Sequence, residues 1–447
     1  MKVLSLFDGM ACGVLAMQKA NIPVSKYVAY EIDKYAIQTS THNFPTIEQR
    51  GDVFKADFTQ FKGFDFLIGG SPCTYWSIAQ KNNRETEASG MGWELFSQYV
   101  RALKEAKPKY FVYENNKSMS KAIRESITNT FGFEPICINS ALVSAQNRQR
   151  LYWCGIRQAD GTYKKADIPQ PEDRGILLKD ILEGSIRLPE YGNEDKSRPL
   201  GASYKNKGAG EGSLAIDCFP DNPNKQKFDY VAEPVNTTPN GKAQTIKAQY
   251  QQTSVAEPIC VAERGRNENG VWEQRFEARE DAKTNALTTV QKDNNVAEPV
   301  RVGALPRPNG ELSTSQAFRI YSTQGKSVNI NAGGGGAGGK TGLYAIPVEF
   351  GNGVPTKAIS CADGKTYDVY EVKNGLITIK GKQYSIKLAD GYYIIRKLTV
   401  RECMRLQTVP EWYEFPVSNA QAYKMLGNGW TVDVISHILS CISQEKL

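Results

Sequence analysis

The chain has 447 residues, of which 40% are apolar and 23% charged, and its formal net charge is +7. This composition is typical of a globular protein with two or three domains, and the mild basic excess permits a polyanionic partner without requiring one. No apolar run approaches the roughly 18 to 20 residues that span a bilayer, and the first residues lack the pattern of a secretion signal, so we expect a cytoplasmic protein.

The use of cysteine and histidine excludes several kinds of site. The nine cysteines are spread singly, without a CxxC pair, which argues against a disulfide framework and a zinc cluster. The two histidines, His42 and His437, are too isolated for a metal site or a Ser/His/Asp triad. We therefore expect no bound metal.

The first 155 residues alternate short apolar strands with amphipathic helical stretches, a pattern typical of an open α/β sheet with crossover helices. The predicted strands cover residues 3–7, 27–30, 64–68, 110–113, 134–138 and 150–155. The predicted helices cover residues 14–20, 33–42, 95–106 and 118–131.

From about residue 158 to 389 the chain is rich in Asn, Gln, Gly, Pro and Thr, so we expect short strands and loops there. Near the end of this block, Asn374-Gly375 and Asp390-Gly391 stand between alternating strands and predict hairpin turns. The remaining residues are predicted to form helices at 399–406 and 430–443.

Two parts of the first block suggest a nucleotide-like ligand. The predicted strand at 3–7 runs into a Gly-rich turn that opens a helix, where backbone N–H groups approach a ligand closely. Glu31, after the second strand, is placed to accept hydrogen bonds from ribose hydroxyls, and Asp52 is placed to face an adenine amino group. The alternative is that the glycines only make a tight turn and Glu31 is solvated.

Cys73 follows a strand end within Gly70-Ser71-Pro72-Cys73, at the sheet edge where substrates bind. A single cysteine is more often a small buried apolar residue, but a proline-rigidified loop lifts this one out of the strand, where a thiolate can attack a ligand. The next strand delivers Glu114 to the same edge, either as an acid/base group or as a solvated carboxylate. Arg148 and Arg150 lie two apart in a strand and project together, either paired with carboxylates or recognising a base oxygen or phosphate.

Taken in order, several segments of the chain resemble the motif series of DNA cytosine-5 methyltransferases; they are FDGMACG, YEID, GD, GGSPC, GWELF, ENN, QNRQR, RKLTVRECMRLQ and GNGWTVDVI. The resemblance covers both ends of the chain, about half of its length. It implies a Rossmann-like α/β AdoMet-dependent methyltransferase fold with a large inserted β- and loop-rich target-recognition domain. Residues 1–160 and 396–447 would form the catalytic domain, and residues 161–395 the recognition domain.

The resemblance also implies the reaction, in which a methyl group passes from S-adenosyl-L-methionine to C5 of a cytosine flipped out of duplex DNA. Cys73 would bond to C6, Glu114 would supply the proton donor at N3, and Arg148 and Arg150 match the family's arginines, with Arg150 at the cytosine O2. The cofactor-binding positions that it carries over are Phe7, Gly9, Gly13, Glu31, Asp52, Leu95, Asn428 and Trp430.

The implied partner is double-stranded DNA, bound by a monomer in a bacterial or phage-infected cell, and the class also includes enzymes with a cognate restriction endonuclease. Two alternatives stay open. An RNA cytosine-5 methyltransferase is disfavoured by the more than 200 inserted residues, because a tRNA enzyme of this type needs little recognition domain. A catalytically inactive DNA-binding regulator is disfavoured because both Cys73 and Glu114 are present.

Overall fold

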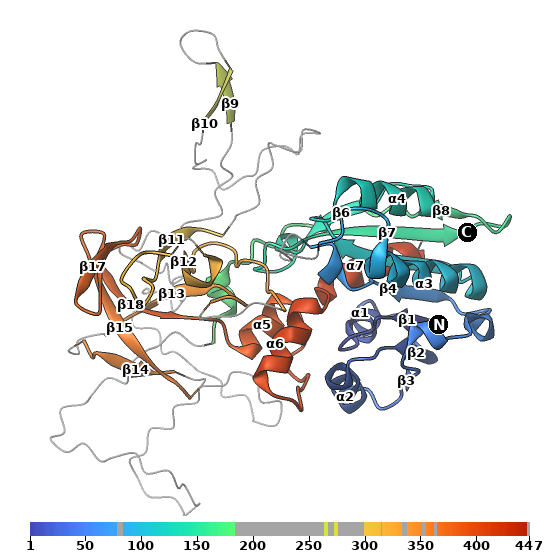
Figure 1. Cartoon of the computed structure of the whole chain (residues 1–447), viewed down its shortest axis with the longest axis horizontal. Coiled ribbons are helices and arrows are strands. Elements are labelled where there is room, and N and C mark those ends of the chain that lie inside the picture. Colours follow the sequence, from blue (N-terminus) through green and yellow to red (C-terminus); the bar gives the residue numbers. More distant parts are fainter. Residues whose placement is uncertain are drawn as a thin grey trace, which may run out of the picture.

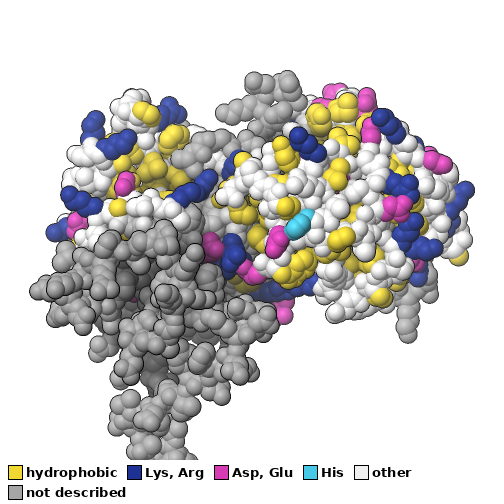
Figure 2. Space-filling view, turned by 90° about the horizontal axis from the view of Figure 1, so that it is seen from below, with side chains coloured by type: hydrophobic (Ala, Val, Ile, Leu, Met, Phe, Trp, Pro, Cys, Tyr) yellow, Lys and Arg dark blue, Asp and Glu magenta, His cyan; other side chains and the backbone are white. Residues whose placement is uncertain are grey.

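The computed structural model describes residues 1–77, 84–183, 263–266, 272–275, 299–313, 315–332, 338–350, 355–361 and 364–444. Figure 1 shows two lobes, each built around a sheet, with the helices α5 (Val400–Leu406) and α6 (Asn419–Asn428) between them. No helix among these residues has the length and apolar character needed to cross a bilayer. On the face in Figure 2, basic and acidic side chains of the described residues are interspersed.

The first lobe contains an eight-stranded sheet in the order β3-β2-β1-β4-β5-β7-β6, with β8 paired to β7. The strands from β1 to β5 are parallel, whereas β7 runs antiparallel to β5 and β6. The strand order reverses between β1 and β4, so the carboxyl ends of these strands border the crevice in which such sheets bind ligands. The strands are β1 (Lys2–Leu6), β2 (Lys26–Tyr30), β3 (Glu48–Gln49), β4 (Phe66–Gly69), β5 (Tyr110–Asn116), β6 (Ile136–Asn139), β7 (Gln149–Arg157) and β8 (Tyr163–Lys165).

Helices cover both faces of this sheet, which is why its central strands are continuously apolar. One hydrophobic cluster packs α1, α2 and α7 on one face, and a second packs α3 and α4 on the other. The helices are α1 (Cys12–Lys19), α2 (Lys34–Asn43), α3 (Gly90–Ala106), α4 (Lys121–Phe131), α5 (Val400–Leu406), α6 (Asn419–Asn428) and α7 (Val432–Gln444). The predicted α/β fold is confirmed, although α6 was not predicted and α3 begins at Gly90 rather than at residue 95.

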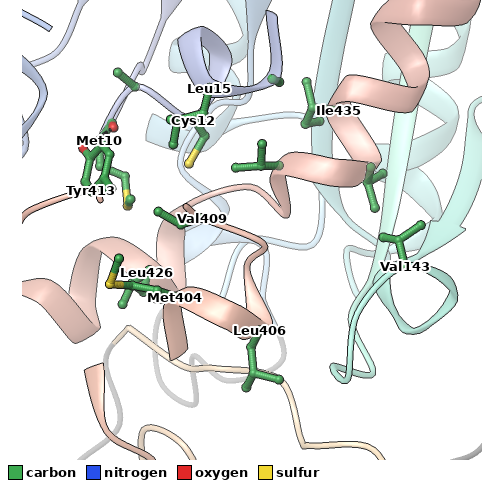
Figure 3. Close-up of a cluster of buried hydrophobic side chains, with 14 of the residues drawn as sticks. Met10, Cys12, Leu15, Val143, Met404, Leu406, Val409, Tyr413, Leu426 and Ile435 are labelled. Atoms are coloured by element: carbon green, nitrogen blue, oxygen red, sulfur yellow. Dashed lines mark hydrogen bonds between the residues drawn. The ribbon is translucent and has the colours of Figure 1, made fainter. Parts of the chain in front are cut away.

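The C-terminal helices pack against the Gly-rich turn that follows β1. Met10 from this turn and Cys12 at the start of α1 lie in the same buried cluster as Leu426 of α6 and Ile435 of α7 (Figure 3). The hydroxyl of Tyr413 donates a hydrogen bond to the Met10 carbonyl at 2.6 Å. Residues about 400 positions apart therefore form one wall of the crevice.

The second lobe is a mixed sheet in the order β11-β12-β13-β18-β15-β16-β17, with β14 paired to β15. The described part of residues 158–389 contains strands and short 3₁₀ turns and no α-helix, which confirms the prediction of short strands and loops there, although β8 of this block pairs with β7 of the first sheet. The strands are β11 (Arg301–Ala304), β12 (Arg319–Ser322), β13 (Leu343–Val348), β14 (Ala358–Ser360), β15 (Thr366–Lys373), β16 (Leu376–Ile379), β17 (Lys382–Ser385) and β18 (Gly391–Arg396), and β9 (Glu263–Arg266) pairs separately with β10 (Trp272–Arg275).

One of the two predicted hairpin turns is confirmed. Asn374 and Gly375 join β15 to β16 with φ values of 52° and 69°, as a tight two-residue turn requires. The prediction at Asp390-Gly391 is wrong, because β18 pairs with β13 and β15 and not with β17. The Asp390 carboxylate instead accepts a hydrogen bond from the Asn374 N–H at 2.8 Å.

Candidate active site

The turn after β1 has an unusual backbone. Phe7, Gly9 and Ala11 have φ values of 58°, 60° and 62°, a region that non-glycine residues seldom adopt and that is often found at functional sites. A side chain at Gly9 would meet no atom within 4 Å, so the turn is open there. A side chain at Gly13 would instead lie 2.5 Å from both Ile68 and Tyr27, so Gly13 allows the turn to pack on the sheet.

Glu31 is fixed by backbone donors beyond the end of β2. One carboxylate oxygen accepts the Gly9 N–H at 2.8 Å, and the other accepts the N–H groups of Ile32 and Asp33 at 2.8 Å each. Asp33 caps α2 and forms a 2.7 Å ion pair with Lys424 of α6. The backbone donors fix the orientation of the Glu31 carboxylate, and the ion pair attaches the start of α2 to α6.

Asp8 is a buried carboxyl group that the sequence analysis did not single out. Its Oδ1 accepts hydrogen bonds from the hydroxyls of Ser5 and Tyr27, both at 2.6 Å, while its Oδ2 is buried without a hydrogen-bond partner. Burial, opposed by these two hydrogen bonds and assisted by the nearby charge of Glu31, raises the pKa of Asp8 to about 6. In the sequence, its position inside the Gly-rich turn FDGMACG could have identified Asp8 as a candidate site residue.

The second half of the crevice is centred on Glu114 of β5. The carboxylate lies 3.1 Å from Nε of Arg150, and its Oε2 accepts the indole N–H of Trp430 at 2.9 Å. A side chain at Gly70 would come within 2.7 Å of the Glu114 carbonyl and 2.9 Å of Oε2, so only glycine allows the loop after β4 to lie this close. Glu114 and Arg150 are both nearly buried, with side chains 12% exposed.

Hydrogen bonds attach the loop between Gly70 and Tyr75 to β5. The Ser71 hydroxyl hydrogen-bonds to the Tyr113 hydroxyl at 2.7 Å, and the Asn115 amide donates to the Ser71 carbonyl at 3.1 Å. Cys73 begins a short 3₁₀ turn, Cys73–Tyr75, directly after this anchor. Its side chain lies outside the described part of the structure.

Arg148 lies just before β7 and is 3% exposed. Its guanidinium donates to the Gly429 carbonyl at 2.7 Å, to the Gly427 carbonyl at 3.2 Å and to Oδ1 of Asn329 at 2.9 Å. The two arginines therefore have different surroundings, because Arg150 contacts the Glu114 carboxylate whereas Arg148 holds the turn between α6 and α7.

A cavity of about 180 Å³ brings most of the predicted residues together. Its lining includes Phe7, Gly9, Glu31, Glu114, Arg148, Arg150, Asn428 and Trp430, together with Asp8, Lys424 and the neighbours of Cys73, Pro72 and Thr74.

Three predicted cofactor positions lie elsewhere. Gly13 packs beneath the turn, and Leu95 lies half-buried on α3 against the second hydrophobic cluster. Asp52 caps the short 3₁₀ helix Val53–Lys55, where its carboxylate accepts the Phe54 N–H at 3.0 Å. None of the three is among the residues that line this cavity in the described structure.

The sequence profile of the C-5 cytosine-specific DNA methylases matches residues 1–444. The chain therefore belongs to this family and is an enzyme of the DNA cytosine-5 methyltransferase class.

Related proteins match this chain over different fractions of its length. Orphan methyltransferase M.SPRI of Bacillus phage SPR is 25% identical, covering 98% of this chain and 96% of the phage protein. Type II methyltransferase M1.ScrFI of Lactococcus lactis subsp. cremoris is 31% identical over 44% of this chain and 51% of its own length. The structure of the Entamoeba histolytica methyltransferase EhMeth shares the fold, with 11% identity, a TM-score of 0.50, and coverage of 100% of this chain and 99% of that one.

Proposed function

We propose that this protein methylates C5 of a specific cytosine in duplex DNA through a covalent bond between Cys73 and C6, with S-adenosyl-L-methionine as the methyl donor. The observation that carries the proposal is the shared cavity: Glu114 and Arg150 line it, as do the two neighbours of Cys73 and, from the other part of the crevice, Glu31. The match to the family profile over nearly the whole chain supports the same chemistry.

The residues present fit the proposed cofactor, which carries a sulfonium and an ammonium cation. The carboxylates of Asp8, Glu31 and Asp33 line the cavity, and Oδ2 of Asp8 is a buried acceptor without a donor. We assign Glu31 to hydroxyl groups of the ligand, and the aromatic rings of Phe7 and Trp430 to its apolar surfaces. When bound, the cofactor supplies an electrophilic methyl group. Asn428, which also lines the cavity, is the remaining residue that we assign to cofactor binding.

The proposed reaction follows from the weak nucleophilicity of C5. The Cys73 thiolate forms a bond to C6, and a proton delivered to N3 by Glu114 balances the charge that builds up there, so that C5 becomes enamine-like. Arg150 is suited to donate to O2 while it restrains Glu114. After the C5–methyl bond forms, a base takes the C5 proton, the N3 proton returns to the Glu114 carboxylate, and the Cys73 thiolate leaves, which restores the aromatic ring.

Residues 161–395 are proposed to recognise the DNA site, and residues 1–160 and 396–447 to carry out catalysis on a monomer. The target base must leave the duplex to enter a cavity between strand ends, at a cost of a few kcal/mol. Because the described part of residues 161–395 contains no α-helix, strands and loops would have to read the base edges.

A duplex with 5-fluorocytosine at the target tests the proposal, because C5 then carries no removable proton after methyl transfer. With the cofactor present, we expect a denaturation-resistant complex attached through Cys73, with none formed by Cys73→Ser, since a serine hydroxyl is far less ionised than a thiol. Bisulfite sequencing of treated plasmid identifies the site.

Two outcomes would redirect the assignment. Trapping on transfer RNA and not on duplex DNA would favour the RNA enzyme. Binding of duplex DNA with no adduct and no methylation would favour an inactive regulator.

A further inference from the structure

The indole of Trp430 makes a contact that cofactor binding does not require. Its N–H donates to Oε2 of Glu114 at 2.9 Å, while Arg150 Nε lies 3.1 Å from Oε1. The backbone at Gly70 packs against the same carboxylate, with no room for a Cβ. The carboxylate of Glu114 is therefore held by donors from β7 and from the turn before α7, and the packed loop limits its movement on a third side.

The position of Trp430 depends in turn on Arg148. The two guanidinium bonds to the carbonyls of Gly427 and Gly429 fix the backbone on both sides of Asn428, and Gly429 immediately precedes Trp430. A guanidinium is a planar and rigid donor, so two such bonds restrain the orientation of the turn. Because Arg148 is 3% exposed, water does not compete effectively for these carbonyls.

The third partner of Arg148 belongs to the inserted block. Asn329 accepts a hydrogen bond from the guanidinium. Two positions earlier, the Ser327 N–H donates to the Ala145 carbonyl at 2.7 Å, and the Ser327 carbonyl accepts the Asn147 N–H at 3.0 Å. The segment that carries Asn329 is thus attached directly to the chain that leads into Arg148. This contact occupies a further N–H of Arg148 with an acceptor from the inserted block.

We propose that Trp430 and Arg148 are positioning residues for Glu114. Arg148 fixes the turn between α6 and α7, and Trp430 orients the Glu114 carboxylate. This inference rests on the proposed function. Proton delivery requires the protonated Glu114 carboxyl group to lie within hydrogen-bond reach of the base, and a displacement of about 1 Å can cost about a hundredfold in rate. Trp430 and Glu114 line the same cavity, so the Trp430 side chain can contact a ligand there while it holds the acid.

The decisive variant is Trp430→Phe, which keeps an aromatic ring and removes the N–H. We expect kcat to fall by at least about tenfold, with the affinity for S-adenosyl-L-homocysteine, measured by calorimetry, within about threefold of wild type. Trp153→Phe is the matched control, because the buried Trp153 also donates one indole hydrogen bond, to Thr128 at 3.3 Å, away from the cavity. Its kcat should stay within about twofold.

Arg148→Lys provides the second test. The substitution keeps the positive charge but removes the planar guanidinium with its paired donors, so kcat should fall below that of wild type. In the double variant with Trp430→Phe, the fold-decrease in kcat should be smaller than the product of the two single fold-decreases, because both residues act on one carboxylate. The rate of adduct formation with 5-fluorocytosine DNA should follow kcat in each variant.

Three results would overturn the inference. They are an unchanged kcat in Trp430→Phe, a loss of kcat that is matched by an equal loss of S-adenosyl-L-homocysteine affinity, and an equal loss in Trp153→Phe. A wild-type protein without methylation activity would refute the proposed function itself and this role with it. An active wild-type protein with an unaffected Trp430→Phe variant would refute this inference alone.

Discussion

The buried carboxyl group of Asp8 is expected to reduce the stability of the cofactor-free protein at neutral pH. Its Oδ2 has neither a hydrogen-bond donor nor solvent contact, and burial is the main reason that its pKa rises from 3.8 to about 6. Asp8→Asn removes the charge and keeps an acceptor for Ser5 and Tyr27. We predict that this variant gains stability relative to wild type as the pH rises.

The sign and size follow from proton linkage. Between about pH 4 and pH 6 the folded protein binds more protons at Asp8 than the unfolded chain does, so the free energy of unfolding falls as the pH rises through this window. A rise of about 2 in the pKa corresponds to a penalty of about 3 kcal/mol at pH 7.5 and to about half of that at pH 5. The amide group of Asn adds a cost of its own, which is the same at both pH values and cancels in the comparison.

Urea denaturation of both proteins at these two pH values measures the effect. The stability of Asp8→Asn relative to wild type should be greater at pH 7.5 than at pH 5 by about 1 kcal/mol. Asp57→Asn is the control, because Asp57 is exposed and its hydrogen bonds to Thr59 lower its pKa, so the variant should not gain stability at neutral pH. A stability difference for Asp8→Asn that is the same at both pH values would refute the reasoning.

Three further predictions concern other parts of the chain. Glu31→Ala should weaken S-adenosyl-L-homocysteine binding by at least about tenfold in calorimetry, since a charged acceptor is lost, and unchanged affinity would remove Glu31 from the site. Exchange of residues 161–395 for the block of a related enzyme should move the methylated site in bisulfite sequencing to that of the donor; persistence of the original site would contradict this. Arg396→Leu should cost about 3–5 kcal/mol in urea denaturation, because it leaves the fully buried Glu402 without its 2.7 Å partner, whereas the half-exposed Arg401→Leu should cost under about 1 kcal/mol; equal costs would show that burial is not decisive.

Local sequence patterns determined most of the elements of the first lobe. The alternation of apolar runs and amphipathic stretches predicts strands and helices because side-chain periodicity depends on neighbours within a few positions. Asn374-Gly375 was sufficient for a hairpin because both residues tolerate positive φ. Asp390-Gly391 carried a similar signal without forming such a turn, because the pairing of β18 with β13 and β15 depends on distant segments.

The ordered motifs identified the residues around the cavity, but their individual contacts were decided by the tertiary structure. Glu114 meets Trp430 across 316 positions, and Arg148 meets Gly429 across 281, separations at which no local pattern specifies a hydrogen-bond partner. The same packing leaves Asp52 outside the cavity lining and includes Asp8 in it. The sequence by itself determined which chemical groups are available, whereas the packing of the C-terminal helices against the turn after β1 decided which of them meet, because burial and partner geometry arise only when both ends of the chain come together.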